Sequence, residues 1–417
     1  MLQVTLFVEF LRSRPQLTVW AMALLQAVLW TLVPALFFSA PPGQLAESIA
    51  IGHEHQLASH LGPPLAHWLA DAAYGLGKFW IYLLSQACVV VTYWAVFQLG
   101  SAIVGPRHAA IAVMLMGGIF LFTIPTPEFG PSILAMTLWA VALLHFWRAA
   151  EQDRPAYWPA LGLELGLLLL NTYTAFVFIG LLLAYLLMTE RGRAKFTEVG
   201  PWAAGIIIVL LVFPLLLWLD HPRGAAVTPT AMSLELDPLR GLRVLGWLLA
   251  AHVGCAVLIA LGFETPAARR AARPTVDRPP VDPAARYFLY FFALAPVATL
   301  TFFAMIVGGP APIPIAPLAV LSGLAVMVTA PDHLRIAHQR LAGYAWATFV
   351  ILPPLLAVFA ITALPWIFPV EIAVGRPAAE MGRFFGESFE RRTGRPLEIV
   401  TGDAETAALV ALAAPSR

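Results

Sequence analysis

Long apolar runs alternate with short polar segments along almost the whole chain, which predicts a bundle of membrane-spanning helices. A helix rises about 1.5 Å per residue, so about 20 consecutive apolar residues are needed to cross the hydrocarbon core. About eleven runs approach this length, a few of them short. We expect membrane helices near residues 17–40, 79–104, 109–124, 132–147, 158–171, 174–188, 202–219, 242–263, 287–307, 311–329 and 342–365.

The composition agrees with a multi-pass membrane protein. Hydrophobic residues make up 60% of the 417 residues and charged residues 12%, whereas a soluble domain is about 45–50% apolar and about 25% charged. A net charge of +1 gives no reason to expect a nucleic acid partner. Cys88 and Cys255 both lie inside apolar runs, so we expect them to pack in the bundle rather than to form a disulfide or metal site.

Lysine and arginine are distributed unevenly between alternate loops, and this asymmetry predicts the orientation in the membrane. With a cytoplasmic N-terminus, the cytoplasmic loops carry Arg12, Arg14, Arg107, Arg148, Arg154, Arg191, Arg193, Lys195, Arg269, Arg270, Arg273, Arg278, Arg286, Arg335 and Arg340. Before the C-terminal tail, the opposite side carries only Lys78, Arg223, Arg240 and Arg243. We therefore expect a multi-pass protein of the bacterial inner membrane, with residues 41–78, 125–132 and 220–240 and the C-terminal tail in the periplasm.

Two segments differ from the membrane helices in composition. Residues 264–286 are rich in proline, alanine and arginine, which is typical of a flexible linker, here on the cytoplasmic side. The chain divides into a membrane domain, residues 1–366, with its outer loop at 41–78, and a short periplasmic segment, residues 367–417. In that segment we expect a helix over 378–392, a strand over 396–401 and a second helix over 404–413. The expected fold class is thus an all-α polytopic membrane protein with a short C-terminal α/β segment.

The outer loop is unusually polar for this chain. Its stretch PPGQLAESIAIGHEHQLASHLGPPLAHW, residues 41–68, holds Glu47, His53, Glu54, His55, His60 and His67. Polar groups next to a membrane are costly unless water or a substrate reaches them. If the segment is helical, Glu47 and Glu54 share one face, and either could act as a general base toward an acceptor hydroxyl. The alternative is a pair of solvated carboxylates on an interfacial helix.

The histidines of this loop do not form a recognised metal motif. The run His53-Glu54-His55 with His60 lacks the spacing of HExxH, and no second ligand cluster is visible elsewhere in the sequence. We expect imidazoles that lie on the surface or contact a phosphate, and no resident cofactor, although a divalent metal remains an open alternative.

Two other segments carry polar residues at the same predicted outer depth. Residues 125–132, PTPEFGPS, contain Glu128, and residues 171–174, NTYT, interrupt a leucine-rich run. Tyr173 and its neighbours could donate hydrogen bonds to a phosphate or a sugar. We expect both segments to converge with residues 41–68 on one outward-facing cavity. A helix-terminal carboxylate and a plain helix–turn–helix corner are the alternatives.

Several stretches, in this order, resemble the bacterial membrane glycosyltransferases of family 39, which are dolichyl-phosphate-mannose–protein mannosyltransferase-like enzymes with the GT-C fold. Lipid A aminoarabinose transferases are similar. The matching stretches are GPPLAHWL (62–69), LSQACVVVTYWAVFQLGSAIVGPRHAAIAV (84–113), TPEFGPSILAMTLWAVAL (126–143), WPALGLELGLLLLNTYTAF (158–176) and FERRTGRPLEIVTGD (389–403).

The resemblance implies a transferase that moves a sugar from a polyprenyl-phosphate donor to a periplasmic lipid, glycan or protein, without a nucleotide sugar. In such enzymes an acidic residue of the first outer loop activates the acceptor, and basic or polar groups hold the donor phosphate. It implies Glu47 and Glu128 as catalytic residues, and as substrate-binding residues Gln44, His53, Glu54, His60, Tyr173 and Arg240.

The chain departs from the family pattern at four positions. Gln44, Gly62, Gly130 and Thr172 stand where relatives usually have Asp, His, Asn and Lys. Glutamine cannot accept a proton as a base, and threonine cannot neutralise a phosphate. Two hypotheses follow: an active transferase, or a non-catalytic relative that binds a polyprenyl lipid or supports a partner enzyme. A transporter is less favoured, because we find no inverted repeat and no titratable group in mid-span other than Glu164.

Overall fold

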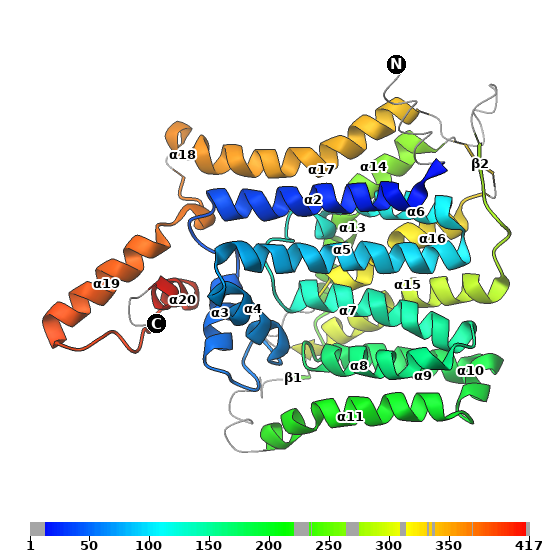
Figure 1. Ribbon diagram of the computed structural model, residues 1–417, viewed down its shortest axis with the longest axis horizontal. Helices are drawn as coiled ribbons and strands as arrows, with labels where there is room; N and C mark the ends of the chain where they lie inside the picture. Colours follow the sequence, from blue (N-terminus) through cyan, green and yellow to red (C-terminus); the bar gives the residue numbers. More distant parts are fainter. Residues whose placement is uncertain are drawn as a thin grey trace.

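The helices of the protein run side by side in one elongated bundle in the computed structural model (Figure 1). The structure describes residues 13–220, 233–234, 236–263, 275–308, 314–331, 333–335, 338–368 and 370–413. We name the two ends of the bundle after the short helices found there. The α3 end carries α3 (Leu45–His53), and the α10 end carries α10 (Glu190–Lys195).

Six helices of the described residues are long and apolar enough to cross a membrane, and a bent pair, α13–α14, raises the number to seven. They are α2 (Pro15–Phe37), α5 (Lys78–Ile103), α7 with its π-helical extension (Pro131–Glu151), α11 (Val199–Asp220), α15 (Pro283–Ile306), α17 (Gln339–Thr362) and the pair α13 (Pro238–Ala251) and α14 (Val253–Gly262). This confirms the predicted all-α polytopic membrane protein.

The four remaining predicted spans contain shorter helices. They are α6 (Pro106–Met116), α8 (Trp158–Leu169), α9 (Ala175–Met188) and α16 (Ser322–Thr329), the last preceded by the 3-10 turn Ala316–Ala319. Helices therefore occur at every predicted position, but these four are shorter than the about 20 residues that a straight span requires.

The predicted span 109–124 is broken at Met116, where α6 ends. The chain then continues through turns, so its carbonyl groups need partners from other helices. Gln26, fully buried on α2, donates a hydrogen bond to the carbonyl oxygen of Phe122. The hydroxyl of Tyr93 on α5 in turn donates to Oε1 of Gln26 at 2.9 Å. Gln26 of α2, held by Tyr93 of α5, thus supplies one of the hydrogen bonds that the broken segment needs.

Aromatic rings hold the centre of the bundle between α7, α9 and α15. Trp139 of α7 stacks on Phe178 of α9 with ring centroids 3.8 Å apart, and Phe146 meets Phe292 of α15 edge-on at 5.8 Å. Each large aromatic side chain buries about 150–250 Å². These contacts fix the three helices at one relative depth.

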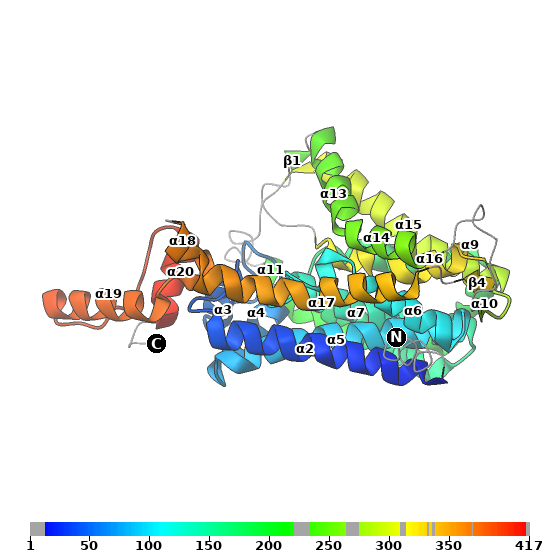
Figure 2. The same cartoon turned by 90° about the horizontal axis from the view of Figure 1, so that it is seen from above.

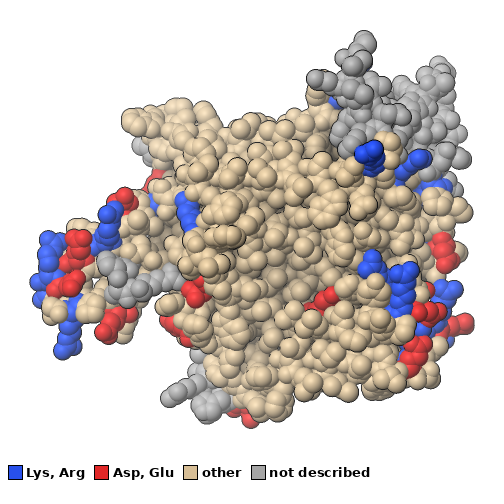
Figure 3. All heavy atoms as spheres, in the orientation of Figure 1, with Lys and Arg blue, Asp and Glu red and all other residues tan. Residues whose placement is uncertain are grey.

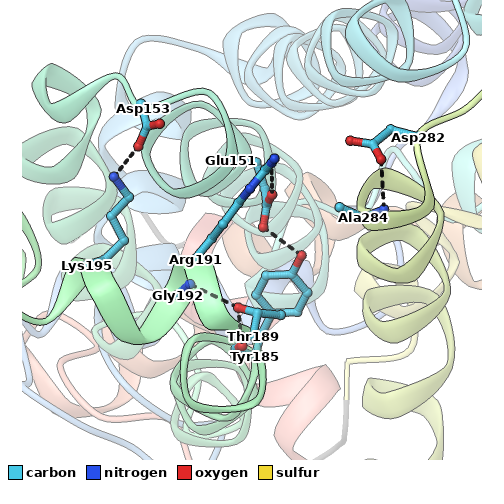
Figure 4. Close-up of polar contacts among 9 residues, drawn as sticks. All are labelled: Glu151, Asp153, Tyr185, Thr189, Arg191, Gly192, Lys195, Asp282 and Ala284. Atoms are coloured by element: carbon cyan, nitrogen blue, oxygen red, sulfur yellow. Dashed lines mark hydrogen bonds and ion pairs between the residues drawn. The ribbon is translucent and has the colours of Figure 1, made fainter.

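The α10 end is fastened by ion pairs (Figure 4). The amine of Lys195, only 7% exposed, binds the carboxylates of Asp153 and Glu198. Beside it, Glu151 accepts a 2.8 Å hydrogen bond from the hydroxyl of Tyr185 and lies 3.5 Å from Arg191. Since Glu151 ends the π-helical extension of α7, these contacts tie α10 to the end of that helix.

Charged side chains gather at the two ends of the molecule. On the face drawn in Figure 3, Lys and Arg lie at the α10 end and on the C-terminal segment, and the surface between them is largely uncharged. Many large hydrophobic side chains on this bundle are exposed, for example Trp202 at 62% and Leu210 at 68%. An apolar belt between two polar ends is what a bilayer requires.

The C-terminal segment consists of α19 (Ala378–Thr393) and α20 (Ala404–Ala413). The predicted strand over 396–401 is wrong: these residues form neither a strand nor a helix. A strand needs a partner for its N–H and C=O groups, and none pairs with this stretch in the described part of the chain. The segment packs on α3 through small apolar residues, while α19 extends away from the bundle (Figures 1 and 2).

Two short antiparallel strand pairs join loops of the bundle. β1 (Ser233–Leu234) pairs with β3 (Val307–Gly308), and β2 (Thr275–Asp277) pairs with β4 (His333–Arg335).

The second pair corrects part of the predicted linker 264–286, of which residues 264–274 lie outside the described part. After β2, the buried guanidinium of Arg278 donates hydrogen bonds to the carbonyl oxygens of Met327 and Val328, at 2.6 and 3.1 Å. Asp282 then caps α15, accepting from the N–H of Ala284 at 3.3 Å (Figure 4). These contacts order the second half of the segment.

Candidate functional site at the α3 end

The outer loop folds into two packed helices, α3 and α4 (Leu65–Gly75), which lie across the end of the bundle. Leu45 and Ile49 on α3 and Ala66 and Ala70 on α4 are buried in one apolar cluster. On its other side α3 contacts the C-terminal segment, where Ala46 packs with residues of α19 and α20. α3 is therefore held from two sides, which fixes the direction of its polar side chains.

Glu128 reaches across to the start of α3. Its Oε1 accepts a 2.8 Å hydrogen bond from the main-chain N–H of Gln44. Gly43 makes this approach possible: its φ is +54°, and a Cβ there would lie 2.3 Å from the Glu128 carboxylate. Burial raises the pKa of Glu128, and the hydrogen bond from Gln44 partly opposes that rise. Residues 41–68 and 125–132 are thus in contact, as predicted, whereas the outward-facing cavity expected between them stays a prediction.

Buried polar groups of α5 position the loop that carries Glu128. Ser85 donates a hydrogen bond to the carbonyl oxygen of Thr126, and Nε2 of Gln86 donates to the hydroxyl of Thr126 at 2.9 Å. Both α5 side chains are fully buried. Glu128 follows Thr126 by two residues, so its backbone is anchored to a membrane helix.

Glu47 and His60 form a pair that the sequence did not predict. Oε1 of Glu47 lies 2.8 Å from Nε2 of His60, with side-chain exposures of 16% and 59%. His60 sits in a tight turn in which Ser59 and Gly62 exchange both main-chain hydrogen bonds, at 2.9 and 3.0 Å. The pair brings the accessible carboxylate of α3 into contact with an imidazole at the surface.

His67, absent from the predicted site residues, is a buried neighbour of this pair. Its Nδ1 lies 2.7 Å from the hydroxyl of Ser48 on α3, and the residue is 1% exposed. Burial, and secondarily the charge of His60, lowers the pKa of His67 to about 4, so this imidazole is neutral at neutral pH. Within the described part of the chain, its Nε2 has no hydrogen-bond partner. The sequence signal that could have identified His67 is its position in the PPLAHW stretch.

The segment 171–174 joins the same region. The amide of Asn171 donates to the carbonyl oxygen of Pro131 at 2.8 Å, and the N–H of Leu65 donates to the carbonyl oxygen of Leu170 at 3.0 Å. The turn therefore contacts the starts of both α7 and α4. Burial raises the pKa of the Tyr173 hydroxyl, which has no hydrogen-bond partner among the described residues. The three predicted segments thus meet at one end of the bundle.

The other predicted site residues lie at the margin of this region or away from it. His53, at the end of α3, lies 3.4 Å from Asp71, and the Glu54 carboxylate accepts a hydrogen bond from the side chain of Gln56. Among the described residues, no group of three His, Cys, Asp or Glu side chains could hold a metal ion. Arg240 pairs with Asp237 at 3.1 Å in the first turn of α13, which Figure 2 shows well away from α3.

Of the four basic residues expected on the outer side, Lys78 lies at the α3 end. It begins α5, and its amine donates a hydrogen bond to the carbonyl oxygen of Phe38. A small cavity of about 30 Å³ lies beside it, lined in part by Tyr74 and Tyr82. Arg223 lies outside the described residues.

Comparison with known proteins agrees with this architecture. Residues 62–218 match the sequence model of the dolichyl-phosphate-mannose-protein mannosyltransferase family. The crystal structure of ArnT from Cupriavidus metallidurans bound to undecaprenyl phosphate is 14% identical, and the match covers 95% of this chain and 74% of that one with a TM-score of 0.54. The apo structure of ArnT gives a TM-score of 0.51 at the same identity and coverage. A search of curated proteins by sequence gives no match. The structural match confirms a GT-C-like fold.

Proposed function

We propose that the protein transfers a sugar from a polyprenyl-phosphate donor to an acceptor at the α3 end, because residues 62–218 match the protein mannosyltransferase family model and the chain has a GT-C-like fold. The acceptor class is a periplasmic lipid, glycan or protein, and the protein resides in the bacterial inner membrane with the α3 end in the periplasm. The observation that carries the proposal is the meeting of three polar segments, 41–68, 125–131 and 171–174, at one end of a membrane bundle.

Two carboxylates are available for activation of the acceptor. Glu47 is partly accessible on α3. Glu128 is more buried and already accepts a hydrogen bond from the main-chain N–H of Gln44. We assign the activation of the acceptor to Glu47 together with its partner His60, and to Glu128 the task of holding the start of α3 in place. A carboxylate near a helix N-terminus also interacts favourably with the helix dipole.

The reaction is a displacement at the anomeric carbon. A base takes the proton of the acceptor hydroxyl, the oxygen forms a bond to the anomeric carbon, and the bond from that carbon to the phosphate oxygen breaks. The polyprenyl phosphate leaves with the electron pair. A well-positioned general base contributes about 10²–10⁴-fold to such a rate.

The donor is held by polar groups around the two carboxylates. Tyr173 and His60 lie in segments that meet here and can donate hydrogen bonds to a sugar or a phosphate. Among the described residues, the Tyr173 hydroxyl has no hydrogen-bond partner. His53 and Glu54 flank the end of α3. Lys78 is a basic residue at this end that can reach toward a phosphate, in exchange for its contact with Phe38. It would supply the positive charge that Thr172 cannot.

One alternative function is supported by specific residues. Gln44 stands where relatives have an acid and contributes its main-chain N–H rather than a base, and Thr172 carries no charge. A protein with these substitutions could bind a polyprenyl lipid or support a partner enzyme without transferring a sugar. Binding of undecaprenyl phosphate without turnover would favour this alternative.

The test is transfer of a labelled sugar from a polyprenyl-phosphate donor in membranes that contain the protein. Glu47→Gln keeps the shape of the side chain and removes the carboxylate on which acceptor activation depends, so we expect transfer to fall by about 10²–10⁴-fold. The control is Glu387→Gln on the exposed face of α19, which should leave transfer unchanged. Unimpaired transfer by Glu47→Gln would remove Glu47 from the mechanism. If even the wild-type protein transfers no sugar, the enzyme proposal fails.

A further inference from the structure

We infer that His60 is the group that receives the proton of the acceptor, and that Glu47 acts as its positioning residue. This inference rests on the proposed function and refines it, because the proton passes to an imidazole rather than to a carboxylate.

Exposure decides which of the two groups an acceptor meets first. The side chain of His60 is 59% exposed and that of Glu47 only 16%, with 2.8 Å between Nε2 and Oε1. An acceptor that approaches from solvent therefore reaches the imidazole before the carboxylate. Glu47 lies behind His60 on α3, whose buried face fixes it against α4.

The hydrogen bond to Glu47 also selects the tautomer of His60. A carboxylate can only accept, so the shared hydrogen lies on Nε2, which leaves the lone pair of Nδ1 for a substrate proton. Among the described residues, no hydrogen bond to Nδ1 of His60 is found. A carboxylate that holds an imidazole by one nitrogen while the other takes a proton is the arrangement of hydrolase triads.

The turn that carries His60 limits its motion. Ser59 and Gly62 pair through two main-chain hydrogen bonds, and the hydroxyl of Ser59 also accepts from the N–H of Leu61 at 3.2 Å. Gly62, with φ at +125°, allows the tight reversal, and Pro63 follows it directly. A base held on such a short turn keeps its geometry at little further entropic cost when the substrate arrives.

The titratable neighbours of His60 come from two helices. Glu47 faces it from α3, and His67, which interacts with its charge, faces it from α4. Since His67 is buried and neutral, it does not compete for the proton at neutral pH. Glu128 is engaged with Gln44 at the start of α3. Among the described residues, Glu47 is thus the carboxylate in contact with His60.

The step balances without a further reactant. The hydroxyl proton of the acceptor moves to Nδ1 of His60, and the electron pair of the O–H bond stays on the oxygen, which bonds to the anomeric carbon. The bond from the anomeric carbon to the phosphate oxygen breaks, and its pair leaves on the polyprenyl phosphate. The resulting imidazolium is stabilised by Glu47 and returns its proton to water, which reaches the exposed side chain.

The first test measures kcat and KM for labelled-sugar transfer by wild type, His60→Asn, Glu47→Gln and the double variant. We expect kcat of His60→Asn to fall by about 10²–10⁴-fold with KM little changed, and the double variant to lose no more than either single one. His55→Asn is the matched control: it removes an exposed imidazole of the same loop, and Asn tolerates its φ of +52°. Wild-type kcat in His60→Asn would overturn the inference and leave the proposed function intact.

The second test is rescue by the conservative variant Glu47→Asp, which keeps a carboxylate on α3 facing Nε2 of His60. We expect Glu47→Asp to retain more kcat than Glu47→Gln, because only a carboxylate can hold the imidazole by accepting its N–H. Equal kcat in the two variants would overturn the positioning role. Binding of undecaprenyl phosphate is measured in parallel; a wild type that binds this lipid but transfers no sugar refutes the proposed function, and the inference with it.

Discussion

The main-chain N–H of Gln44 and Oε1 of Glu128 are 2.8 Å apart although 84 residues separate them in the chain. Gln44 contributes its backbone to this contact, and the carboxylate comes from another loop. This contact places the start of α3, and with it Glu47, relative to the membrane helices. This hydrogen bond, and the glycine that lets the two loops approach, therefore add to the apolar packing that holds α3 in place.

Gly43→Ala should disturb this contact directly. The new Cβ would lie 2.3 Å from the Glu128 carboxylate, and the φ of +54° costs a residue with a side chain about 1–2 kcal/mol. We expect a lower thermal unfolding temperature in detergent and a loss of sugar transfer. Gly75→Ala is the matched control, because nothing lies within 4 Å of its Cβ position. Equal unfolding temperatures for the two variants would contradict the role assigned to Gly43.

The pKa of Glu128 leads to a prediction about pH and stability. Burial raises this pKa above the ordinary value of 4.5, so ionisation is harder in the folded than in the unfolded protein. The stability contributed by the protonated carboxyl is present below pH 4.5 and is lost as the pH rises through the folded pKa. Glu128→Gln keeps an oxygen that can accept the Gln44 N–H but cannot ionise. We expect the difference in unfolding temperature, wild type minus variant, to decrease as the pH is raised from 4 to 7. A difference that stays constant would argue against the raised pKa of Glu128.

The buried Gln26 offers a test of the broken span. It links the hydroxyl of Tyr93 to the carbonyl of Phe122, and Gln26→Leu would leave both groups without this partner. Each unsatisfied buried group costs about 1–3 kcal/mol. We expect a clear loss of stability in detergent, whereas Gln16→Leu, at an exposed position of the same helix, should be nearly neutral. A stable Gln26→Leu protein would mean that residues 117–130 do not depend on α2.

The sequence was sufficient for the helix positions, because hydropathy over about 20 residues reports directly on the transfer of a helix into lipid. It was not sufficient where a distant partner decides the local structure. The break after Met116 depends on Gln26 from another helix, and residues 396–401 have β propensity but pair with no strand among the described residues. A pattern in one stretch of sequence contains no information about either partner.

The candidate site also has features that local sequence predicts and features that distant partners decide. The polar content of the three segments predicted their convergence, because such groups avoid lipid and collect at one end of a bundle. The contact between Glu47 and His60 depends on the turn at Ser59–Gly62, and the burial of His67 depends on the packing of α4 against α3. The sequence also predicted four basic residues on the outer side. Only the fold shows that Lys78 lies at the α3 end and that Arg240 lies on α13.

The orientation of the bundle yields the last prediction. Most of the Lys and Arg residues before the C-terminal tail belong to loops at the α10 end. They include Arg191, which pairs with Glu151, and Lys195, which pairs with Asp153. By the positive-inside tendency this end faces the cytoplasm, and the α3 end with its C-terminal segment faces the periplasm. A reporter that is active only in the periplasm should therefore be active when fused after Ala413 and inactive when fused after Lys195. A cytoplasmic reporter should give the reverse pattern at the same two positions. If the fusion after Ala413 is active in the cytoplasm, the candidate site faces the wrong side for a periplasmic acceptor, and the proposed transfer reaction fails with the topology.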